Sequence, residues 1–164
     1  MGVSFRFRPL RWRDVPAIGA WRYEPPYDCY NLGYTYVFLA VLNSRLRGAV
    51  GVEFYGVWSD ADELVGMFTF TRRGKVITLG LAMRPDLTGK GNGLEFVRAG
   101  MAFAKRRFAP TSFRLEVRTF NQRAIKVYER AGFMPGKTFS KLTGHGVQEF
   151  LEMKRDAADE RYDS

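Results

Sequence analysis

The chain has 164 residues, of which 46% are apolar, and these values are typical of a single globular domain with a sizeable core. Its formal net charge of +9 favours an anionic ligand or partner without specifying which one. The single cysteine, Cys29, excludes an internal disulfide framework, and no apolar stretch is long enough to span a membrane. The first ten residues alternate Phe and Arg instead of forming a signal-peptide core, which indicates a cytoplasmic protein.

The first half of the chain predicts a strand, two helices and three further strands. Phe5 and Phe7 alternate with arginines, Asp14 is placed to cap a helix, and large apolar residues recur every four positions from Tyr34. Three strand-like segments follow, separated by turns at 59–62 and 73–74. The predicted ranges are strand 5–9, helix 14–21, helix 34–47, and strands 50–58, 64–71 and 76–83.

A glycine-rich segment, Thr88-Gly89-Lys90-Gly91-Asn92-Gly93, precedes a helix predicted over 94–108. Its glycines let the main chain approach a ligand, and the first N–H groups of the helix lack intrahelical partners, so the segment is suited to an anion. The phosphate loop of nucleotide hydrolases is excluded because Gly91 stands where Ser or Thr is needed. A dinucleotide fingerprint is excluded because Leu94, Glu95 and Phe96 follow the last glycine. A flexible surface turn is the alternative interpretation.

A second strand and helix bring two titratable side chains together. Apolar and charged residues alternate over 113–118 and predict a strand. Asn121 is placed to cap a helix that Gly132 ends. Because the connection is short, we expect Glu116 on the strand and Tyr128 on the helix to lie close together.

Both segments resemble sequence motifs of the GCN5-related N-acetyltransferases, the GNAT superfamily. Residues 88–93 are similar to its acetyl-CoA pyrophosphate loop, with Thr88 where Arg or Gln is usual. Residues that match its second motif are Asn121, Ala124, Tyr128, Gly132 and Phe133. The stretch 115–118, with Asn121 and Tyr128, is most similar to the enzymes that acetylate the N-terminus of a ribosomal protein. The resemblance covers about residues 76–134.

The resemblance implies an α/β (α+β) fold with a mixed, mostly antiparallel sheet of six to seven strands and about four flanking helices. The implied order is a strand, two helices, three strands, a helix, a strand, a helix and a closing hairpin, which we predict at 134–139 and 147–153. We expect one acetyltransferase domain over 1–155 and a polar tail over 156–164 that is frayed or forms a short helix.

The implied cofactor is acetyl-CoA. Backbone N–H groups near the end of the strand 76–83 would hold its acetyl and pantetheine carbonyls, and the glycine segment would hold its diphosphate. Arg123 and Lys126 are placed to reach the 3′-phosphate, and exposure of both side chains to solvent is the alternative. The expected cofactor contacts are Leu81, Ala82, Met83, Thr88, Gly89, Lys90, Gly91, Asn92, Gly93, Leu94, Asn121, Arg123 and Tyr128.

The expected chemistry needs a proton acceptor for the attacking amine and a proton donor for the leaving thiolate. We predict Glu116 as the base, directly or through a water, and Tyr128 as the acid; ion pairing of Glu116 with a neighbouring cation is the alternative. Glu53 is the second candidate base and an expected acceptor contact. The aromatic loop 23–31 either packs on the core or forms a wall of the acceptor site through Tyr27, Asp28 and Tyr30.

Two functions from different classes follow. The first is acetyl transfer to the primary amine of a small molecule or peptide, by direct attack in a ternary complex. The second is a non-catalytic basic module that binds nucleic acid or the ribosome, and the scattered positions of the basic residues argue against it. No metal site is predicted, because His145 has no ligating partners nearby, and no membrane partner is expected. A homodimer through the last strands is left open.

Overall fold

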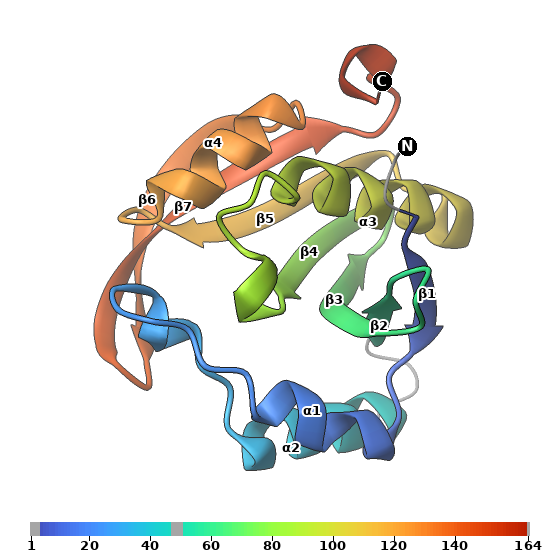
Figure 1. Cartoon of the computed structure of the whole chain (residues 1–164). Coiled ribbons are helices and arrows are strands. Elements are labelled where there is room, and N and C mark those ends of the chain that lie inside the picture. Colours follow the sequence, from blue (N-terminus) through green and yellow to red (C-terminus); the bar gives the residue numbers. More distant parts are fainter. Residues whose placement is uncertain (1–3, 47–50, 164) are drawn as a thin grey trace.

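Figure 1 shows the computed structural model of the protein, which describes residues 4–46 and 51–163. The strands are β1 (Arg6–Pro9), β2 (Val52–Trp58), β3 (Leu64–Arg73), β4 (Val76–Met83), β5 (Ser112–Arg118), β6 (Met134–Thr143) and β7 (Gly146–Asp156). They form one sheet in the order β1-β2-β3-β4-β5-β7-β6, and only the β4–β5 pair is parallel. The prediction of a mixed, mostly antiparallel sheet is confirmed. Within the described residues, no helix has the length and apolar character needed to cross a membrane.

The helices are α1 (Val15–Gly19), α2 (Tyr34–Leu46), α3 (Gly93–Phe108) and α4 (Gln122–Arg130), with short 3-10 turns η1 (Trp12–Asp14), η2 (Tyr27–Tyr30), η3 (Pro85–Leu87) and η4 (Glu160–Tyr162). The predicted order of strands and main helices is therefore confirmed. Helices α3 and α4 lie on one face of the sheet, and α1 and α2 lie together on the other side (Figure 1). The sheet is thus the middle of three layers.

Each face of the sheet has its own apolar core. The larger core lies under α3 and α4 and includes the fully buried rings of Phe68, Phe96 and Phe113. The smaller core joins α1 and α2 to the sheet through Ile18, Val37 and Met67, with Phe54 packed beside it. Because the two faces are buried separately, the chemistry of each can differ.

Helix α1 and the closing hairpin differ most from their predicted form. Helix α1 has only five residues, and the Asp14 carboxylate accepts the Arg11 backbone N–H at 2.9 Å instead of capping that helix. The closing hairpin is longer than predicted, because β6 and β7 continue to pair up to Thr143 and Gly146. The ends of two predicted elements, Arg47 and Val50, lie outside the described residues.

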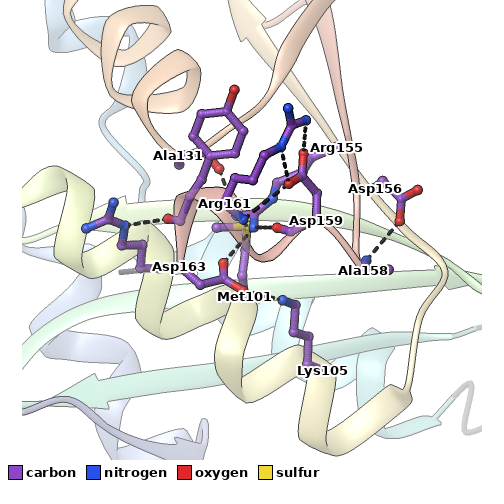
Figure 2. Close-up of polar contacts among 11 residues, drawn as sticks. Met101, Lys105, Ala131, Arg155, Asp156, Ala158, Asp159, Arg161 and Asp163 are labelled. Atoms are coloured by element: carbon purple, nitrogen blue, oxygen red, sulfur yellow. Dashed lines mark hydrogen bonds and ion pairs between the residues drawn. The ribbon is translucent and has the colours of Figure 1, made fainter.

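The C-terminal tail is docked and contains the short helix η4, so the alternative of a frayed tail is wrong for its described part. Arg155, 3% exposed, donates hydrogen bonds to the Ala131 carbonyl at 2.8 Å and to the Asp159 carbonyl. It also pairs with the Asp163 carboxylate at 2.6 Å, and Lys105 of α3 holds the other oxygen of that carboxylate at 2.6 Å. Figure 2 shows these contacts converging from three parts of the chain. The tail therefore ties α3 to the end of α4.

A fork in the centre of the sheet positions the site. Strand β4 pairs with β5 only from Val76 with Ser112 to Leu79 with Leu115. Beyond that pair β4 continues to Met83 and β5 to Arg118 without pairing to each other. The backbone groups that β4 presents on that side are therefore available to a ligand.

Candidate active site

A groove of about 520 Å³ lies between α3 and α4 and begins at the fork. Its lining residues are Leu81, Met83, Leu87, Thr88, Gly89, Gly91, Gly93, Leu94, Phe96, Val97, Arg123, Ala124, Lys126, Val127, Tyr128 and Arg130. This set brings the end of β4, the glycine segment, the start of α3 and one face of α4 into one open site. The two segments singled out in the sequence therefore meet in three dimensions.

The glycine segment adopts the backbone conformation that its composition predicts. Gly89 and Gly91 have φ values of 71° and 82°, where a side chain causes strain, and α3 begins at Gly93. A Cβ at Gly93 would lie 3.3 Å from Val127, so glycine also allows close approach of α3 to α4. The first N–H groups of α3 thus begin at the groove, at the positive end of the helix dipole.

Cations of α4 continue this positive end along the groove. Arg123, Lys126 and Arg130 are three, four and seven positions apart, so they lie on one face of the helix, and all three line the groove. A Cβ at Gly89 would lie 3.5 Å from the Arg123 guanidinium. Charged donors next to a helix N-terminus are the arrangement that binds phosphate groups.

Tyr128 lines the same groove from the inner side of α4. Its ring packs edge to face on Phe133 with centroids 6.2 Å apart. Burial raises the pKa of the Tyr128 hydroxyl, and the nearby Tyr30 hydroxyl raises it further. The hydroxyl therefore keeps its proton at neutral and moderately alkaline pH.

The aromatic loop 23–31 packs against the start of α4. Asn121 accepts the Ala124 N–H at 3.1 Å, which confirms the predicted cap, and its amide donates to the Tyr30 hydroxyl at 3.1 Å. The Arg123 guanidinium lies 4.2 Å from the centre of the Tyr27 ring. Both tyrosine rings also contact Phe120. Tyr27 and Tyr30 are thus held beside the helix that carries Tyr128.

Tyr23 is a site residue that the sequence did not single out. Its hydroxyl donates to the Met83 carbonyl at 2.6 Å, at the end of β4 where the fork opens. Burial raises its pKa to about 12, against a smaller opposing effect of Arg123. Arg130 was also missed, although its spacing of four from Lys126 places both on one helix face.

Glu116 lies at the fork but on the other face of the sheet from the groove. It comes one residue after Leu115, the last residue of β5 paired to β4, and successive strand residues point to opposite faces. Its two oxygens accept from Arg114 at 3.1 Å and from Lys141 at 2.9 Å. The predicted ion pairing is therefore observed, and Glu116 does not line the groove that holds Tyr128.

Glu53 lies far from the groove. Its carboxylate accepts from the Tyr55 hydroxyl at 2.6 Å and pairs with Arg107 at 3.2 Å. Arg107 is near the C-terminal end of α3, about 21 Å along the helix axis from Gly93, at 1.5 Å per residue. Glu53 therefore does not line the groove, and its role as an acceptor contact or base stays a prediction. The sequence placed Glu53 on a strand but gave no information on which end of the sheet it faces.

Other predicted residues lie at the edge of the site. Ala82 faces a smaller cavity on the other side of β4, and Lys90 and Asp28 are exposed. The Asn92 amide donates to the Leu87 carbonyl at 3.4 Å, and this hydrogen bond connects the two ends of the glycine segment. Thr88 does line the groove, but its hydroxyl donates to the Pro85 carbonyl at 2.7 Å.

The chain matches the family model described as the acetyltransferase (GNAT) family over residues 13–133. It therefore belongs to this family of N-acetyltransferases, whose members use acetyl-CoA as co-substrate. No curated protein matches the chain significantly. The narrower resemblance to ribosomal-protein acetyltransferases is not confirmed by these comparisons.

Solved structures with the same fold include spermidine N-acetyltransferases from Vibrio cholerae. A chimera of SpeG from that organism and hSSAT has a TM-score of 0.74 and 17% identity, covering 94% of this chain and 96% of that one. A dodecameric spermidine N-acetyltransferase has a TM-score of 0.74 and 15% identity, covering 98% of each chain. At this identity the likeness shows the fold and leaves the acceptor to be argued from this chain.

Proposed function

We propose that the protein transfers an acetyl group from acetyl-CoA to a primary amine, with coenzyme A bound in the groove between α3 and α4. The observation that carries this proposal is the combination in one groove of the α3 N-terminus, three cations of α4 and the half-buried Tyr128, whose hydroxyl has a raised pKa. The helix N-terminus and the cations are suited to bind phosphates, and the Tyr128 hydroxyl is suited to give a proton to a leaving group.

The residues of the groove fit each part of the cofactor. The N–H groups at the start of α3 and the main chain at Gly89 and Gly91, where glycine adopts positive φ without strain, would hold the diphosphate, with Arg123 beside them. Lys126 and Arg130 would meet the remaining phosphate. Backbone groups of β4 beyond Leu79, which β5 leaves unpaired, would bind the pantetheine and acetyl carbonyls. Bound there, the cofactor supplies an activated acetyl thioester.

Two side chains would handle the protons. Tyr128 keeps its proton at the working pH because of its burial, so it would donate it to the leaving sulfur. Glu116 lies at the fork on the face of the sheet opposite the cofactor groove, and its oxygens are already held by Arg114 and Lys141. We therefore assign it the role of a base that removes the ammonium proton through a water rather than by direct contact.

The transfer would be direct, with both substrates bound together. A covalent route needs an activated nucleophile, and Cys29, the chain's single cysteine, is poorly suited to that role. Its sulfur contacts the Pro26 carbonyl at 3.8 Å, and burial raises the pKa of its thiol, which disfavours the reactive thiolate. A substitution of Cys29 by Ser should therefore leave turnover unchanged.

The first test is a titration with acetyl-CoA followed by an assay of CoA release with primary amines. Ligand at 100 times its dissociation constant adds about 2.7 kcal/mol to the unfolding free energy, which raises the melting temperature by roughly 5–10 °C for a domain of this size. A melting temperature unchanged at millimolar acetyl-CoA would refute the proposal and favour a non-catalytic binding module.

A further inference from the structure

A second cavity, of about 210 Å³, lies under α2 on the face of the sheet opposite the groove. Its lining residues are Leu32, Tyr36, Val37, Ala40, Phe54, Met67, Thr69, Gly80, Leu81 and Ala82. They come from α2, from the residues before it and from strands β2, β3 and β4. This cavity is separate from the proposed cofactor groove.

Leu81 connects the two sites. It is the one described residue that lines both the groove and the cavity under α2. This is possible because β5 has separated from β4 at that level, so Leu81 borders an opening in the sheet. The last residues that pair β4 to β5 are Leu79 and Leu115. Gly80 and Glu116 come directly after them, so both are on the face of the sheet opposite the groove. An amine at the fork would therefore have its substituent directed under α2.

The described lining of this cavity is apolar and uncharged. Only Tyr36 and Thr69 contribute hydrogen-bonding side chains, and the lining contains no carboxylate. Between residues 15 and 46, the only acidic residues in the sequence are Glu24 and Asp28, and both are exposed on the loop before α2. An ammonium group buried in this cavity would lose its hydration without gaining a partner charge, at a cost of several kcal/mol.

The volume limits the size of the group that enters. An apolar protein cavity of about 150 Å³ accepts a benzene ring, so 210 Å³ accommodates one phenyl group or a short alkyl chain. Aromatic and thioether side chains such as Phe54 and Met67 adapt to such groups.

We infer that the acceptor is a monoamine with one compact apolar substituent, and that this substituent occupies the cavity under α2 while the amine lies at the fork. The inference rests on the proposed acetyl transfer and specifies its acceptor class. It separates this chain from the structurally similar spermidine acetyltransferases, whose named substrate carries several ammonium groups. A polyamine would place a charge where the lining offers none.

The test is a calorimetric titration of the purified protein with a homologous series from n-propylamine to n-hexylamine, and with spermidine, in the presence and absence of CoA. Each methylene that enters the cavity should lower the dissociation constant about fourfold until the cavity is full. Spermidine should bind at least tenfold more weakly than n-hexylamine. A dissociation constant that is flat across the series, or tighter binding of spermidine, would overturn the inference.

A pair of variants on α2 locates the effect. Ala40→Phe fills the cavity and should weaken n-hexylamine binding at least tenfold and n-propylamine binding by a smaller factor, while leaving CoA binding unchanged. Leu39→Phe adds the same ring at the neighbouring position, which is 47% exposed and outside the cavity, and should match the wild type. Equal losses in both variants would contradict the assignment of the cavity. If Ala40→Phe does not fold, the wild-type series still decides.

Failure of this inference is distinguishable from failure of the proposed function. Binding of acetyl-CoA with a flat amine series would leave acetyl transfer standing and overturn only the acceptor class. Absence of acetyl-CoA binding would overturn the proposed function, and the series measured without CoA would still test the cavity.

Discussion

Replacement of Gly91 by Ala tests the proposed diphosphate site most directly, because Gly74 offers a matched control. Both glycines have positive φ values, 82° and 59°, and a Cβ at either would meet nothing within 4 Å. Each substitution should therefore cost about 1–2 kcal/mol of unfolding free energy through backbone strain alone, with no steric clash. They differ in location, since Gly91 lines the groove and Gly74 is in the turn between β3 and β4.

The two variants should lose similar stability but differ in affinity. Strain of this size lowers the melting temperature by roughly 2–8 °C for a domain of this length. Only Gly91→Ala places a methyl group where the diphosphate must approach the main chain, so its dissociation constant for acetyl-CoA should rise at least tenfold. Thermal unfolding measures the first effect and calorimetric titration the second. If Gly91→Ala binds acetyl-CoA as tightly as Gly74→Ala, the diphosphate does not lie on this loop.

Four further substitutions test the remaining parts of the argument. Tyr128→Phe should lower kcat about 100-fold with little change in acetyl-CoA affinity, and the loss should grow as pH rises from 7 to 9 in a steady-state profile, because free protons then become scarce; an unchanged kcat would remove this hydroxyl from the mechanism. Glu116→Gln should lower kcat about tenfold or more and flatten the alkaline rise of kcat, whereas a role in ion pairing alone would change only the melting temperature. Lys126→Gln should weaken acetyl-CoA binding about two- to fivefold at low salt and less at high salt. The control Lys75→Gln removes an exposed charge far from the groove and should leave acetyl-CoA affinity unchanged at both salt concentrations. Arg155→Met should cost about 3 kcal/mol in urea unfolding, because it leaves two carbonyls and a carboxylate without their buried partner; a loss below 1 kcal/mol would show that the tail contributes little.

The raised pKa of Tyr128 also sets the sign of a stability change at alkaline pH. The unfolded chain loses this proton near pH 10, while burial keeps it on the folded chain at higher pH. Above pH 10 the folded state therefore binds more protons than the unfolded state, and stability falls as pH rises. Below pH 10 the protonated Tyr128 makes its full contribution to the unfolding free energy. Tyr128→Phe should reduce this alkaline dependence.

Local patterns predicted the elements that carry the cofactor site. Strand β4 was predicted with its observed bounds, and α3 and α4 to within about one residue, because periodicity, glycines and the Asn121 cap are all encoded within a few residues. The glycine segment was predicted for the same reason, since a positive φ is a property of one residue and its neighbours. Such features do not depend on what packs against them.

Features that depend on distant partners were missed or misplaced. Tyr23 contacts the backbone of Met83, 60 residues away, and a backbone partner leaves no signal in the sequence. Arg155 follows the predicted last strand, 147–153, and no local pattern indicates its burial or its partners Ala131 and Asp163. The strand that carries Glu53 was predicted, but the pairing of its carboxylate with Arg107, 54 residues away, could not be read from the strand pattern.

The start of α4 links the two halves of the proposed reaction. The Arg123 guanidinium lies between the Tyr27 ring and the glycine segment, so one charged group serves both the acceptor wall and the phosphate site. A phosphate that draws this guanidinium toward Gly89 would weaken its contact with Tyr27, and the loop would then depend more on the hydrogen bond between Asn121 and Tyr30. Linkage requires that any such effect be reciprocal, so an acceptor that displaces Tyr27 would change acetyl-CoA affinity by the same factor. Because Arg123 contacts both sites, the order in which the two substrates bind should depend on this side chain of α4 as well as on each pocket.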